Sequence, residues 1–521
     1  MGTRLSQSAI WRMQRRYYEQ KGVRAWQRGE LPYYVTSNPL IAHAYAAVIA
    51  GFLRDRSRIK PGTSQPVHIV ELGAGSGQLA YHILRRLDRL MEPLAVQSPG
   101  YRYVMSDISM NYVEEWSVNP KLLPFAEKGQ LDYCLFDAGS SEALSLQVGG
   151  RTIRGGDLEH PVIVIANFVF DSIPQDLFYY ENGTVSECRV ADRPSPASED
   201  ATTNRLPLHI SYHPVKGDCY AHAGYNRVLK EYRSLLSGEG THILFPSAAL
   251  GCLERIAALT TGQELVLLAA DKGTARLEEL ERQPVPEPVP YAGSVSLPMN
   301  FHALYSLYKQ KGIEPLGSPY DRSGMHLACL MAVSHPQSYT ETRLAHELFY
   351  EHFNPDDFYQ VKASFWNNVH ALDLRQLLAW IRLSGYDSSM AEKAADRLYL
   401  LLAQANAADR GEADDVLKRV REASYPVADG SQDIAFTLAS LYFAMGRYEE
   451  ATQLFQESLR TDPDSAATCY NLGLCGYERT EYAEALEYFE RTLMLYPAYE
   501  GAERYAAECR QLLDGKESVN G

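Results

Sequence analysis

The stretch from Val67 to Gly77 constrains the fold of this chain more than any other. Its first residues, Val67-His-Ile-Val-Glu71, form a short run with the β-branched character of a buried strand. Glycines at positions 73, 75 and 77 follow directly, and they remove the Cβ atoms where a ligand would approach the backbone. A helix that starts near Gln78 would point its free N–H groups at the same place. The stretch therefore predicts a strand, a tight turn and a helix at the start of a ligand-binding α/β domain.

Further short apolar runs alternate with helical stretches up to about residue 335. The run at 161–166, Pro-Val-Ile-Val-Ile-Ala, is apolar on both faces, which is typical of a parallel sheet that helices cover on both sides. We therefore predict a Rossmann-like α/β domain with a mostly parallel sheet over residues 67–335, and residues 1–66 as a helical segment of the same unit. The strands predicted after the first one are residues 101–105, 131–136, 161–166, 264–270 and 326–333.

The segments between these runs carry weaker signals. Pro39, preceded by Thr36-Ser-Asn38, indicates the start of a helix, and residues 297–312 predict a late helix. Residues 190–225 are polar and rich in Pro, Ser and Asp, so we predict an insertion or a mobile loop there. The prolines that alternate between Pro284 and Pro290 indicate a rigid, extended crossing loop.

A 34-residue period appears near the C-terminal end, where the sequence predicts only helices. Small residues at the helix crossings and a proline at the end of each period are typical of tetratricopeptide repeats. We predict that residues 432–521 form such repeats and that residues 499–513 within them are the cap helix. Residues 336–431 are predicted as a helical linker or a degenerate repeat. The matching pairs are Leu438 and Leu472, Tyr448 and Tyr482, Ala451 and Ala485, Phe455 and Phe489, and Pro463 and Pro497.

Charge and hydrophobicity limit the partners. The 521 residues include 65 acidic and 50 basic side chains, which give a formal net charge of −15. Because an acidic surface repels phosphates, we expect no nucleic-acid partner. The longest apolar stretch, from Pro39 to Leu53, is interrupted by His43 and is shorter than the roughly 20 residues of a membrane-spanning helix. No secretory signal and no C-x-x-C pair is present, so we predict a cytoplasmic protein with reduced thiols and no membrane span.

The glycine spacing distinguishes between two classes of cofactor. Dinucleotide folds use G-x-G-x-x-G, which would require glycine at position 78, where this chain has Gln78. The pattern here is G-x-G-x-G, and Glu71 precedes it. A carboxylate suits a cationic ligand and is unfavourable beside a pyrophosphate. S-adenosylmethionine carries an ammonium and a sulfonium and no phosphate, so the pattern favours it as the cofactor. A nicotinamide or flavin, or a tight turn without any ligand, is the alternative.

Two further acids stand directly after predicted strands. Asp107 follows the second strand, where a carboxylate can accept hydrogen bonds from both ribose hydroxyls. Asp137 follows the third strand, where it could receive the adenine amino group. A solvated loop acid is the alternative for each of them. The predicted cofactor-binding residues are thus Glu71, Gly73, Gly75, Gly77, Asp107, Asp137 and, after the fourth strand, Asn167.

Residues that follow the fourth predicted strand are the candidates for catalysis. Asn167 could hold the substrate or the methionine end of the cofactor with its amide, and Asp171 could orient or deprotonate a nucleophile. The alternatives are that Asn167 caps the strand end and that Asp171 is a helix N-cap ahead of Pro174. His302 could act as a base but is more often a plain surface or core histidine. The sequence contains no Ser-His-Asp, P-loop or H-E-x-x-H pattern, and we predict no metal site.

Taken together, these motifs resemble those of the MidA-like S-adenosylmethionine-dependent methyltransferases, whose mitochondrial relatives assist respiratory complex I assembly. The resemblance covers about residues 10–335, while the repeats lie outside the family core. It implies a methyltransferase that uses S-adenosylmethionine. Four stretches carry it in order: Tyr33-Tyr-Val-Thr-Ser-Asn-Pro39 with the following helix, the glycine loop Glu71 to Gly77, Ala166-Asn-Phe-Val-Phe-Asp-Ser-Ile-Pro174, and Met299-Asn-Phe-His-Ala-Leu-Tyr305.

The chain departs from the family pattern at two places. The glutamate that follows Ala-Asn in the family is Phe168 here. The family's Asp-Tyr-Gly after the fifth strand is Asp271-Lys272-Gly273 in this chain. Both changes argue against carrying the family's protein-arginine activity over to this protein.

Three functional hypotheses follow from the sequence. The first is a methyltransferase that acts on a protein or peptide recruited by the repeats. The second is a small-molecule methyltransferase in which the repeats form a homodimer. The third is a scaffold that binds the cofactor without turnover.

Overall fold

The computed structural model describes residues 2–22, 34–92, 100–191, 208–236, 238, 240–291, 294–317, 325–352, 354–425 and 433–520. The chain forms two compact units that meet in sequence between Gln360 and Val361. Among the described residues, no helix is long and apolar enough to cross a membrane. Three stretches that enter the predictions above lie outside the described residues: Tyr33, residues 192–207 and residues 426–432.

The first unit is built on a sheet in the order β16-β17-β12-β7-β2-β3-β4, with β15 paired to β12. Its five central neighbours, from β12 to β4, run parallel, and β17 runs antiparallel to β12. The predicted mostly parallel sheet is confirmed. The strands are β2 Val67–Leu72, β3 Tyr101–Asp107, β4 Leu131–Leu135, β7 Val162–Asn167, β12 Leu265–Thr274, β15 Met299–Asn300, β16 Pro315–Leu316 and β17 Met325–Ala332.

The parallel strands end at a common level. β2 and β3 pair as far as Leu72 and Ser106, and β7 and β12 pair as far as Asn167 and Ala270. The carboxyl ends of parallel strands lie on the same edge of a sheet, where open α/β proteins bind ligands. The glycine loop and the turn after Asn167 therefore meet at this edge.

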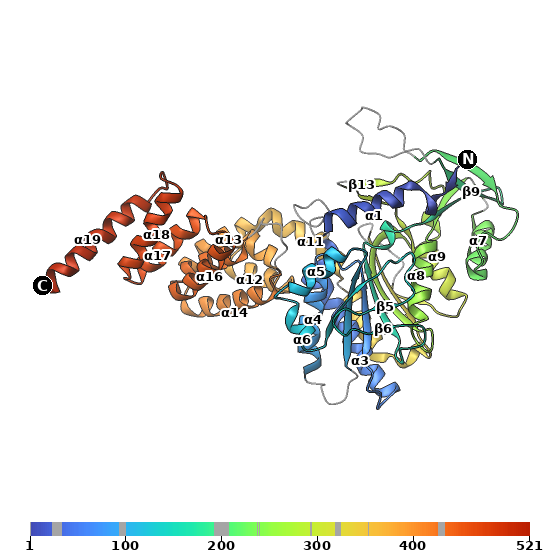
Figure 1. The fold of residues 1–521 in the computed structure, drawn as a ribbon, viewed down its shortest axis with the longest axis horizontal. Coiled ribbons are helices and arrows are strands. Elements are labelled where there is room, and N and C mark those ends of the chain that lie inside the picture. Colours follow the sequence, from blue (N-terminus) through green and yellow to red (C-terminus); the bar gives the residue numbers. More distant parts are fainter. Residues whose placement is uncertain are drawn as a thin grey trace. The chain divides into compact units, whose positions relative to one another are not determined.

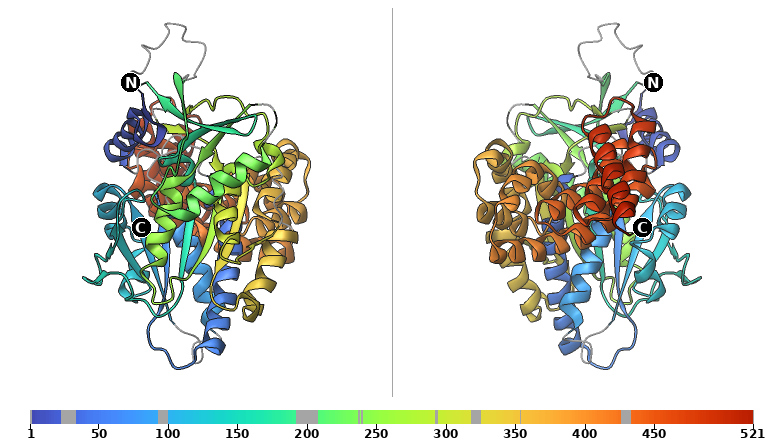
Figure 2. Two further views of the ribbon diagram at one scale, coloured as in Figure 1. Left: turned by 90° about the vertical axis from the view of Figure 1, so that its right-hand side faces the viewer. Right: turned by 90° about the vertical axis from the view of Figure 1, so that its left-hand side faces the viewer.

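Helices cover the two faces of the sheet (Figure 2). On one face, Val70 and Val164 share a buried cluster with Leu250 of α8 and Leu304 of α9. On the other face lie α3 and α4, which pack against each other. The helices of this unit are α1 Ala9–Lys21, α2 Tyr34–Ser37, α3 Pro39–Ile59, α4 Gln78–Met91, α5 Met110–Val118, α6 Leu123–Glu127, α7 Ala223–Leu235, α8 Ser247–Ala257, α9 Phe301–Lys309 and α10 Thr340–His346.

Helix α3 begins where the sequence predicted. Asn38 is its N-cap, and its Oδ1 accepts hydrogen bonds from the backbone N–H groups of Leu40 and Ile41 at 3.0 and 3.1 Å. Pro39 occupies the first turn, where the missing N–H costs nothing. This cap fixes the direction in which the chain enters the face of the sheet.

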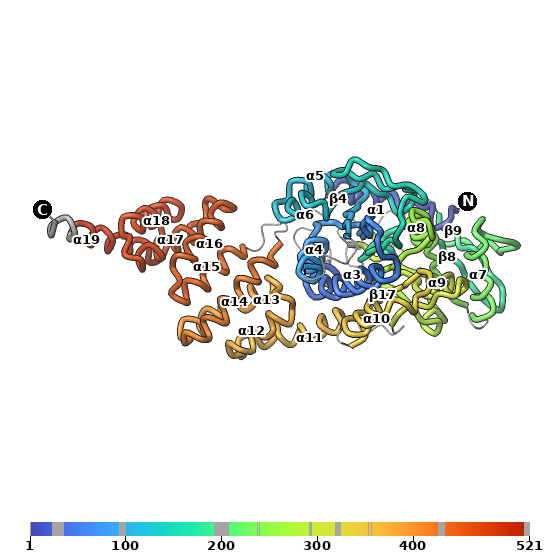
Figure 3. Tube along the Cα trace, turned by 90° about the horizontal axis from the view of Figure 1, so that it is seen from below, coloured from blue at the N-terminus to red at the C-terminus, as the bar shows by residue number. Residues whose placement is uncertain are grey.

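Helix α10 packs closely on α3, and Figure 3 shows the two helices side by side. The buried carboxylate of Asp55 on α3 accepts hydrogen bonds from the backbone N–H and the hydroxyl of Thr342, both at 2.8 Å. The rings of Phe52 and Tyr339 stack with their centroids 5.2 Å apart. A π-helix, Glu347–His352, follows α10. The segment 336–352, which the sequence analysis grouped with the following helices, thus packs into the first unit.

A second, antiparallel sheet accompanies the main one, in the order β1-β9-β8-β11 with β10 paired to β9. Sequence analysis missed it, because its strands lie in and around the segment predicted as an insertion or a mobile loop. Residues 208–225 are part of this structure, since β10 pairs along β9 from Ile210 to Pro214. Its strands are β1 Thr3–Arg4, β8 Asp176–Glu181, β9 Thr184–Val190, β10 Ile210–Pro214 and β11 Thr241–Phe245, and the two smaller hairpins of the unit are β5 Leu144–Ser145 with β6 Thr152–Ile153 and β13 Val289–Tyr291 with β14 Ser294–Ser296.

The second unit contains the repeated helices. Leu438, Ala451 and Phe455 are buried in one cluster, as the 34-residue period predicts. A Cβ atom on Gly473 would lie 2.6 Å from the ring of Phe489, so a small residue is needed where these helices cross. Beginning with α11, which spans the boundary, the helices are α11 Pro355–Asn368, α12 Leu374–Leu383, α13 Ser388–Ala403, α14 Ala407–Ala423, α15 Ile434–Ala444, α16 Tyr448–Thr461, α17 Ala466–Glu478, α18 Tyr482–Leu495 and α19 Ala502–Asn520.

We predict that a chain ending at Gln360 folds cooperatively, whereas a chain ending at residue 335 does not. The shorter chain loses α10, which leaves the buried carboxylate of Asp55 without its Thr342 partners and exposes Phe52. Asp55 keeps its ion pair with Arg58, but the loss of hydrogen bonds to this buried carboxylate costs about 1–3 kcal/mol of unfolding free energy. Urea unfolding followed by circular dichroism checks this. Equal stability of the two chains would show that α10 is not part of the core of this unit.

Candidate cofactor and methyl-transfer site

The glycine loop makes a tight connection between β2 and α4. Gly73, Gly75 and Gly77 have φ angles of 60°, 52° and 82°, a region that residues with a Cβ atom rarely adopt. The Nε1 of Trp116 donates a hydrogen bond to the carbonyl of Gly75 at 2.9 Å. Helix α4 begins directly after Gly77, as the sequence predicted, and the N–H groups of its first turn, of which Gln78 donates to Ser76 Oγ at 3.4 Å, lie next to the loop.

Glu71 at the end of β2 is a buried acid, with only 4% of its surface exposed. Burial raises the pKa of its carboxyl to about 8, although a hydrogen bond from the hydroxyl of Tyr103 at 2.9 Å opposes this rise. Removal of a carboxylate from water disfavours its charged form. A cationic ligand group beside Glu71 would restore that form.

Asp107 ties the end of β3 to the glycine loop. One carboxylate oxygen accepts from the N–H of Gly75 at 3.2 Å, and the other accepts from the N–H of Ile108 at 2.8 Å. Burial raises the pKa of Asp107 to about 7, against the effect of these two bonds. Each oxygen keeps a lone pair that could accept a further hydrogen bond, which suits the predicted ribose contact.

Asn167 at the end of β7 connects three parts of the unit. Its Oδ1 accepts from the hydroxyl of Tyr45 at 2.7 Å and from the N–H of Ala270 at 3.1 Å. Its Nδ2 donates to the carbonyl of Thr36 at 2.9 Å. These bonds hold the segment before α3 against the ends of β7 and β12. The side chain therefore links these three parts, and a contact with the substrate or the cofactor would have to share its amide.

The turn after Asn167 is held in an unusual conformation. Phe168 has a φ of 51°, which is rare for a residue with a large side chain and is found most often where function requires it. The buried carboxylate of Asp271, at the equivalent level of β12, stabilises the turn. Its Oδ2 accepts from the N–H groups of Phe170 and Asp171 at 2.9 and 3.1 Å.

Asp171 lies in this turn and is 4% exposed. The hydroxyl of Ser172 donates to its Oδ1 at 2.8 Å, and Ser296 of β14 also bonds its carboxylate. Burial raises the pKa of Asp171, and burial together with the charge of Asp171 raises the pKa of Asp271. Asp171 is the member of the pair whose oxygens are not engaged by the backbone of the turn, so it is the one that can serve a ligand.

Asp137, after β4, is bound by the N-terminal helix. Its Oδ2 lies 2.5 Å from Nη1 of Arg15 on α1, and its Oδ1 accepts from the N–H of Gly139 at 2.7 Å. Burial opposes ionisation, but these contacts lower the pKa of Asp137 overall. The sequence analysis predicted that this carboxylate binds the adenine amino group. Because Arg15 is already paired with it, the adenine would have to share Asp137 with the arginine or displace it.

An acid therefore lies near the carboxyl end of the parallel pairing in each of the five strands. The sequence analysis identified four of them as site residues, and it recorded Asp271 only as part of a departure from the family pattern. Arg15 and the hydroxyl of Tyr18, both on α1, were missed because an amphipathic helix carries no signal for what it covers. His302, by contrast, bonds the hydroxyl of Tyr232 at 2.9 Å and takes no part in these contacts. The five acids are Glu71, Asp107, Asp137, Asp171 and Asp271.

These residues fit S-adenosylmethionine. Four of the five acids, Glu71, Asp107, Asp171 and Asp271, are buried with raised pKa values, and a ligand with ammonium and sulfonium charges stabilises the ionised forms of the acids that it contacts. The glycine loop leaves the backbone accessible without Cβ atoms. A pyrophosphate at this edge would meet repulsion from the same carboxylates. The fold and the site thus define a Rossmann-like methyltransferase.

The sequence comparison identifies the family. Residues 49–318 match the family described as "Putative S-adenosyl-L-methionine-dependent methyltransferase", and residues 436–503 match the tetratricopeptide repeat. The first match covers slightly more than half of the chain, and the protein belongs to that family. It is an S-adenosylmethionine-dependent methyltransferase with C-terminal tetratricopeptide repeats, which confirms the family resemblance, the cofactor and the repeats predicted from the sequence.

Solved structures with some similarity to the chain are methyltransferase-like but distant. Two proteins of one superfamily from Burkholderia thailandensis, one uncharacterized and one bound to S-adenosyl-homocysteine, are 17% and 18% identical, with TM-scores of 0.37 and 0.33. The alignments cover 61% and 54% of this chain and 73% and 63% of theirs. The magnesium protoporphyrin IX methyltransferase of Synechocystis PCC 6803 is 10% identical with a TM-score of 0.27, over 61% of this chain and 98% of its own. No match was found among curated proteins.

We predict that the affinity for S-adenosylhomocysteine rises with pH between about 5.5 and 7.5. In the free protein the carboxyls of Glu71 and Asp107 have pKa values near 8 and 7. An ammonium and two hydroxyl donors favour their ionised forms, so binding releases protons. For each carboxyl that must ionise, affinity then increases by up to about tenfold per pH unit below its pKa. The ligand's own amino group stays protonated below about pH 7.7.

Calorimetry of the wild type and of Asp107→Asn checks this. The amide oxygen can still accept a hydrogen bond from the N–H of Gly75 or of Ile108, so one contact that stabilises the loop remains. The negative charge is lost. We expect binding of Asp107→Asn at pH 7.5 to be weaker by about 1–3 kcal/mol and its pH dependence to be shallower. A flat profile for the wild type would mean that these carboxyls do not contact the ligand.

Proposed function

We propose that the protein transfers the methyl group of S-adenosylmethionine to a protein or peptide that its repeats recruit. The observation that carries the proposal is the covalent joining of a methyltransferase unit to a separate compact unit of tetratricopeptide repeats. Stacks of such repeats form concave surfaces that bind peptides. A tethered recruitment site raises the effective concentration of its partner near the catalytic unit.

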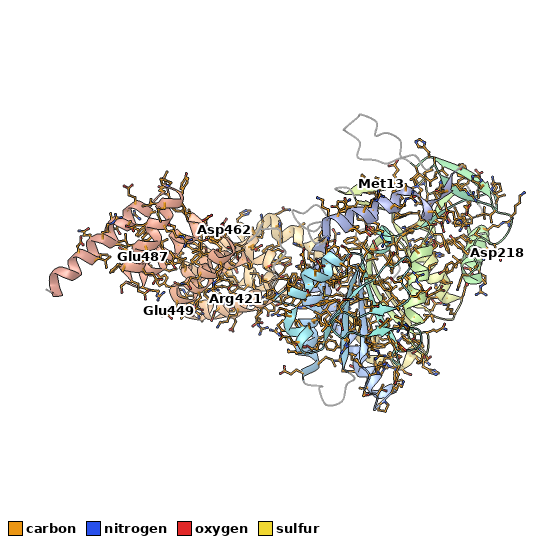
Figure 4. The ribbon with its side chains drawn as sticks, viewed as in Figure 1. Met13, Asp218, Arg421, Glu449, Asp462 and Glu487 are labelled. Carbon is orange, nitrogen blue, oxygen red and sulfur yellow. The ribbon has the colours of Figure 1, made fainter. Side chains whose placement is uncertain are left out.

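The charge of the second unit indicates the kind of partner. Residues 361–521 contain 26 acidic and 16 basic side chains. Exposed acids include Glu449 on α16 and Glu487 on α18, both labelled in Figure 4. An acidic surface attracts a basic one and accelerates their encounter. We therefore infer a partner with a basic surface.

Within the first unit, we assign roles along the carboxyl edge of the sheet. Glu71 and the glycine loop would hold the methionine end of the cofactor, and Asp107 would hold its ribose. The cofactor supplies an electrophilic methyl group, and the protein has to align a nucleophile with it and exclude water. Asp171 would receive the proton of that nucleophile, and Asn167 would keep the surrounding strand ends in place.

Phe168 makes arginine an unfavourable acceptor. A guanidinium remains protonated at physiological pH and is held best by a carboxylate in a two-pronged contact. The family's glutamate at this position could make that contact, and the chain has Phe168 instead, in a strained turn. A half-buried aromatic ring can stack on a cation or a flat group but cannot accept its protons.

We predict that the full chain transfers label from methyl-tritiated S-adenosylmethionine to proteins of a cell extract. A chain ending at Gln360 should bind S-adenosylhomocysteine with unchanged affinity but label protein at least tenfold less, because recruitment is lost. Gly75→Val is the inactive control, since a branched side chain at a φ of 52° is strained and fills the ligand space. Gel fluorography and scintillation counting measure the transfer.

The other functional hypotheses give different results in the same experiment. Label that appears only in small molecules would identify a small-molecule methyltransferase, with the repeats used for dimerisation. Cofactor binding without transfer into any fraction would identify a non-catalytic scaffold. Equal protein labelling by the full and the shortened chain would contradict recruitment by the repeats.

A further inference from the structure

Helix α1 runs across one end of the main sheet (Figure 1), and it contacts the loops that follow the strands there. Arg15 binds Asp137 after β4, and Asn111 at the start of α5 donates to the carbonyl of Glu19 at 3.4 Å. Gln14, the residue before Arg15, accepts a hydrogen bond from the backbone N–H of Val295 in β14. The helix thus spans both the part of the edge assigned to the cofactor and the part beside Asp171.

Tyr18 is the residue of α1 that faces both the part of the edge assigned to the cofactor and the part beside Asp171. Its hydroxyl shares a hydrogen bond with Ser294 of β14. Burial raises the pKa of Tyr18, and the charges of Asp171 and Asp107 raise it further, so its hydroxyl lies within electrostatic reach of both carboxylates. The space between the ribose-binding carboxylate and Asp171 is where methyl group and nucleophile would have to meet. Met13, labelled in Figure 4, lies on the exposed surface of the same helix.

We propose that Tyr18 and Asp171 together form the acceptor half of the methyl-transfer site and that they bind the ammonium group of an amine. This inference rests on the proposed function and names its substrate class. An ammonium has three donors and no acceptor. Around Asp171 the structure offers a carboxylate and the hydroxyls of Ser172 and Ser296, and Tyr18 adds a fourth oxygen from α1.

Charge and acidity argue against three other acceptor classes. A carboxylate acceptor would be repelled by Glu71, Asp107, Asp171 and Asp271; among the described residues, Arg15 pairs with Asp137, and Lys272 acts on Asp171. An alcohol is too weak an acid to lose its proton to a carboxylate. A guanidinium, whose pKa exceeds about 12, would need the fork-like partner that Phe168 replaces. An amine, with a pKa near 10.4 in lysine, brings the positive charge that these acids favour and a proton that Asp171 can accept.

The proton and electron balance of the step is simple. The ammonium gives one proton to the carboxylate of Asp171 and becomes a neutral amine. Its nitrogen lone pair then forms a bond to the methyl carbon, while the sulfur–methyl bond breaks and its electron pair stays on sulfur. The product is a methylated ammonium, and Asp171 returns its proton to solvent after the product leaves. Tyr18 orients the amine by accepting one of its remaining hydrogens.

Sinefungin provides a test that does not need an identified substrate. In sinefungin a carbon that bears an ammonium group replaces the sulfur of S-adenosylhomocysteine, and the ammonium stands where the methyl group of S-adenosylmethionine would be, so it places a cation in the proposed acceptor half. For the full chain, we expect sinefungin to bind at least about tenfold more tightly than S-adenosylhomocysteine. Asp171→Asn and Tyr18→Phe should each remove about tenfold of the sinefungin affinity and change the affinity for S-adenosylhomocysteine less than about threefold.

Tyr17→Phe is the matched control, because it removes the same atom from the neighbouring residue of the same helix, and both affinities should stay unchanged. Equal losses for the two ligands in Tyr18→Phe or Asp171→Asn would overturn the proposal, since the residues would then act on the fold or on the cofactor in general. Failure of the wild type to bind S-adenosylhomocysteine at all would instead contradict the methyltransferase function. A methyl label recovered from the acceptor as methylarginine or as a base-labile ester would also overturn the proposal, whereas recovery as an N-methylamine supports it.

Discussion

The ligand preference of this protein depends on the burial of carboxylates at one edge of its sheet. Parallel strands place their carboxyl ends together, and here each of five neighbouring strands brings an acid to that edge. Glu71, Asp107 and Asp171 lose water there, so their charged forms become unfavourable without a partner. The site therefore favours the binding of a cationic ligand. The carboxylates of Asp107 and Asp271 accept hydrogen bonds from backbone N–H groups of the neighbouring loops. These bonds compensate part of the lost hydration and stabilise the loops.

The same constraint explains why α1 belongs to the site. An edge that carries so much negative charge needs cationic or hydroxyl partners when it closes, and α1 brings both in Arg15 and Tyr18. The helix is attached by polar contacts near the site and by Trp11, which is buried in an apolar cluster with Leu177 and Leu244. Both kinds of contact fix α1 beside the carboxylates that it faces.

Sequence reasoning identified the parts of the protein whose signals are local. The run before Glu71, the glycine spacing and the apolar 161–166 segment predicted the sheet, and the 34-residue period predicted the repeats. The antiparallel sheet was missed because β10 depends on pairing with β9, which a polar segment does not reveal. In the site, the positions of Glu71 and Asp107 followed from strand ends. The pairing of Arg15 with Asp137 and the link from Asn167 to Thr36 join residues 122 and 131 positions apart, and only the fold brings them together.

The central claim is that the acids at the strand ends form one binding edge for S-adenosylmethionine, with the acceptor side at Asp171. A crystal structure of the full chain with S-adenosylhomocysteine tests it most directly. The account predicts ribose hydroxyls within hydrogen-bond distance of Asp107, the amino group near Glu71, and the sulfur directed toward the space between Tyr18 and Asp171. A ligand bound away from this edge, or one whose sulfur faces away from Asp171, would contradict it.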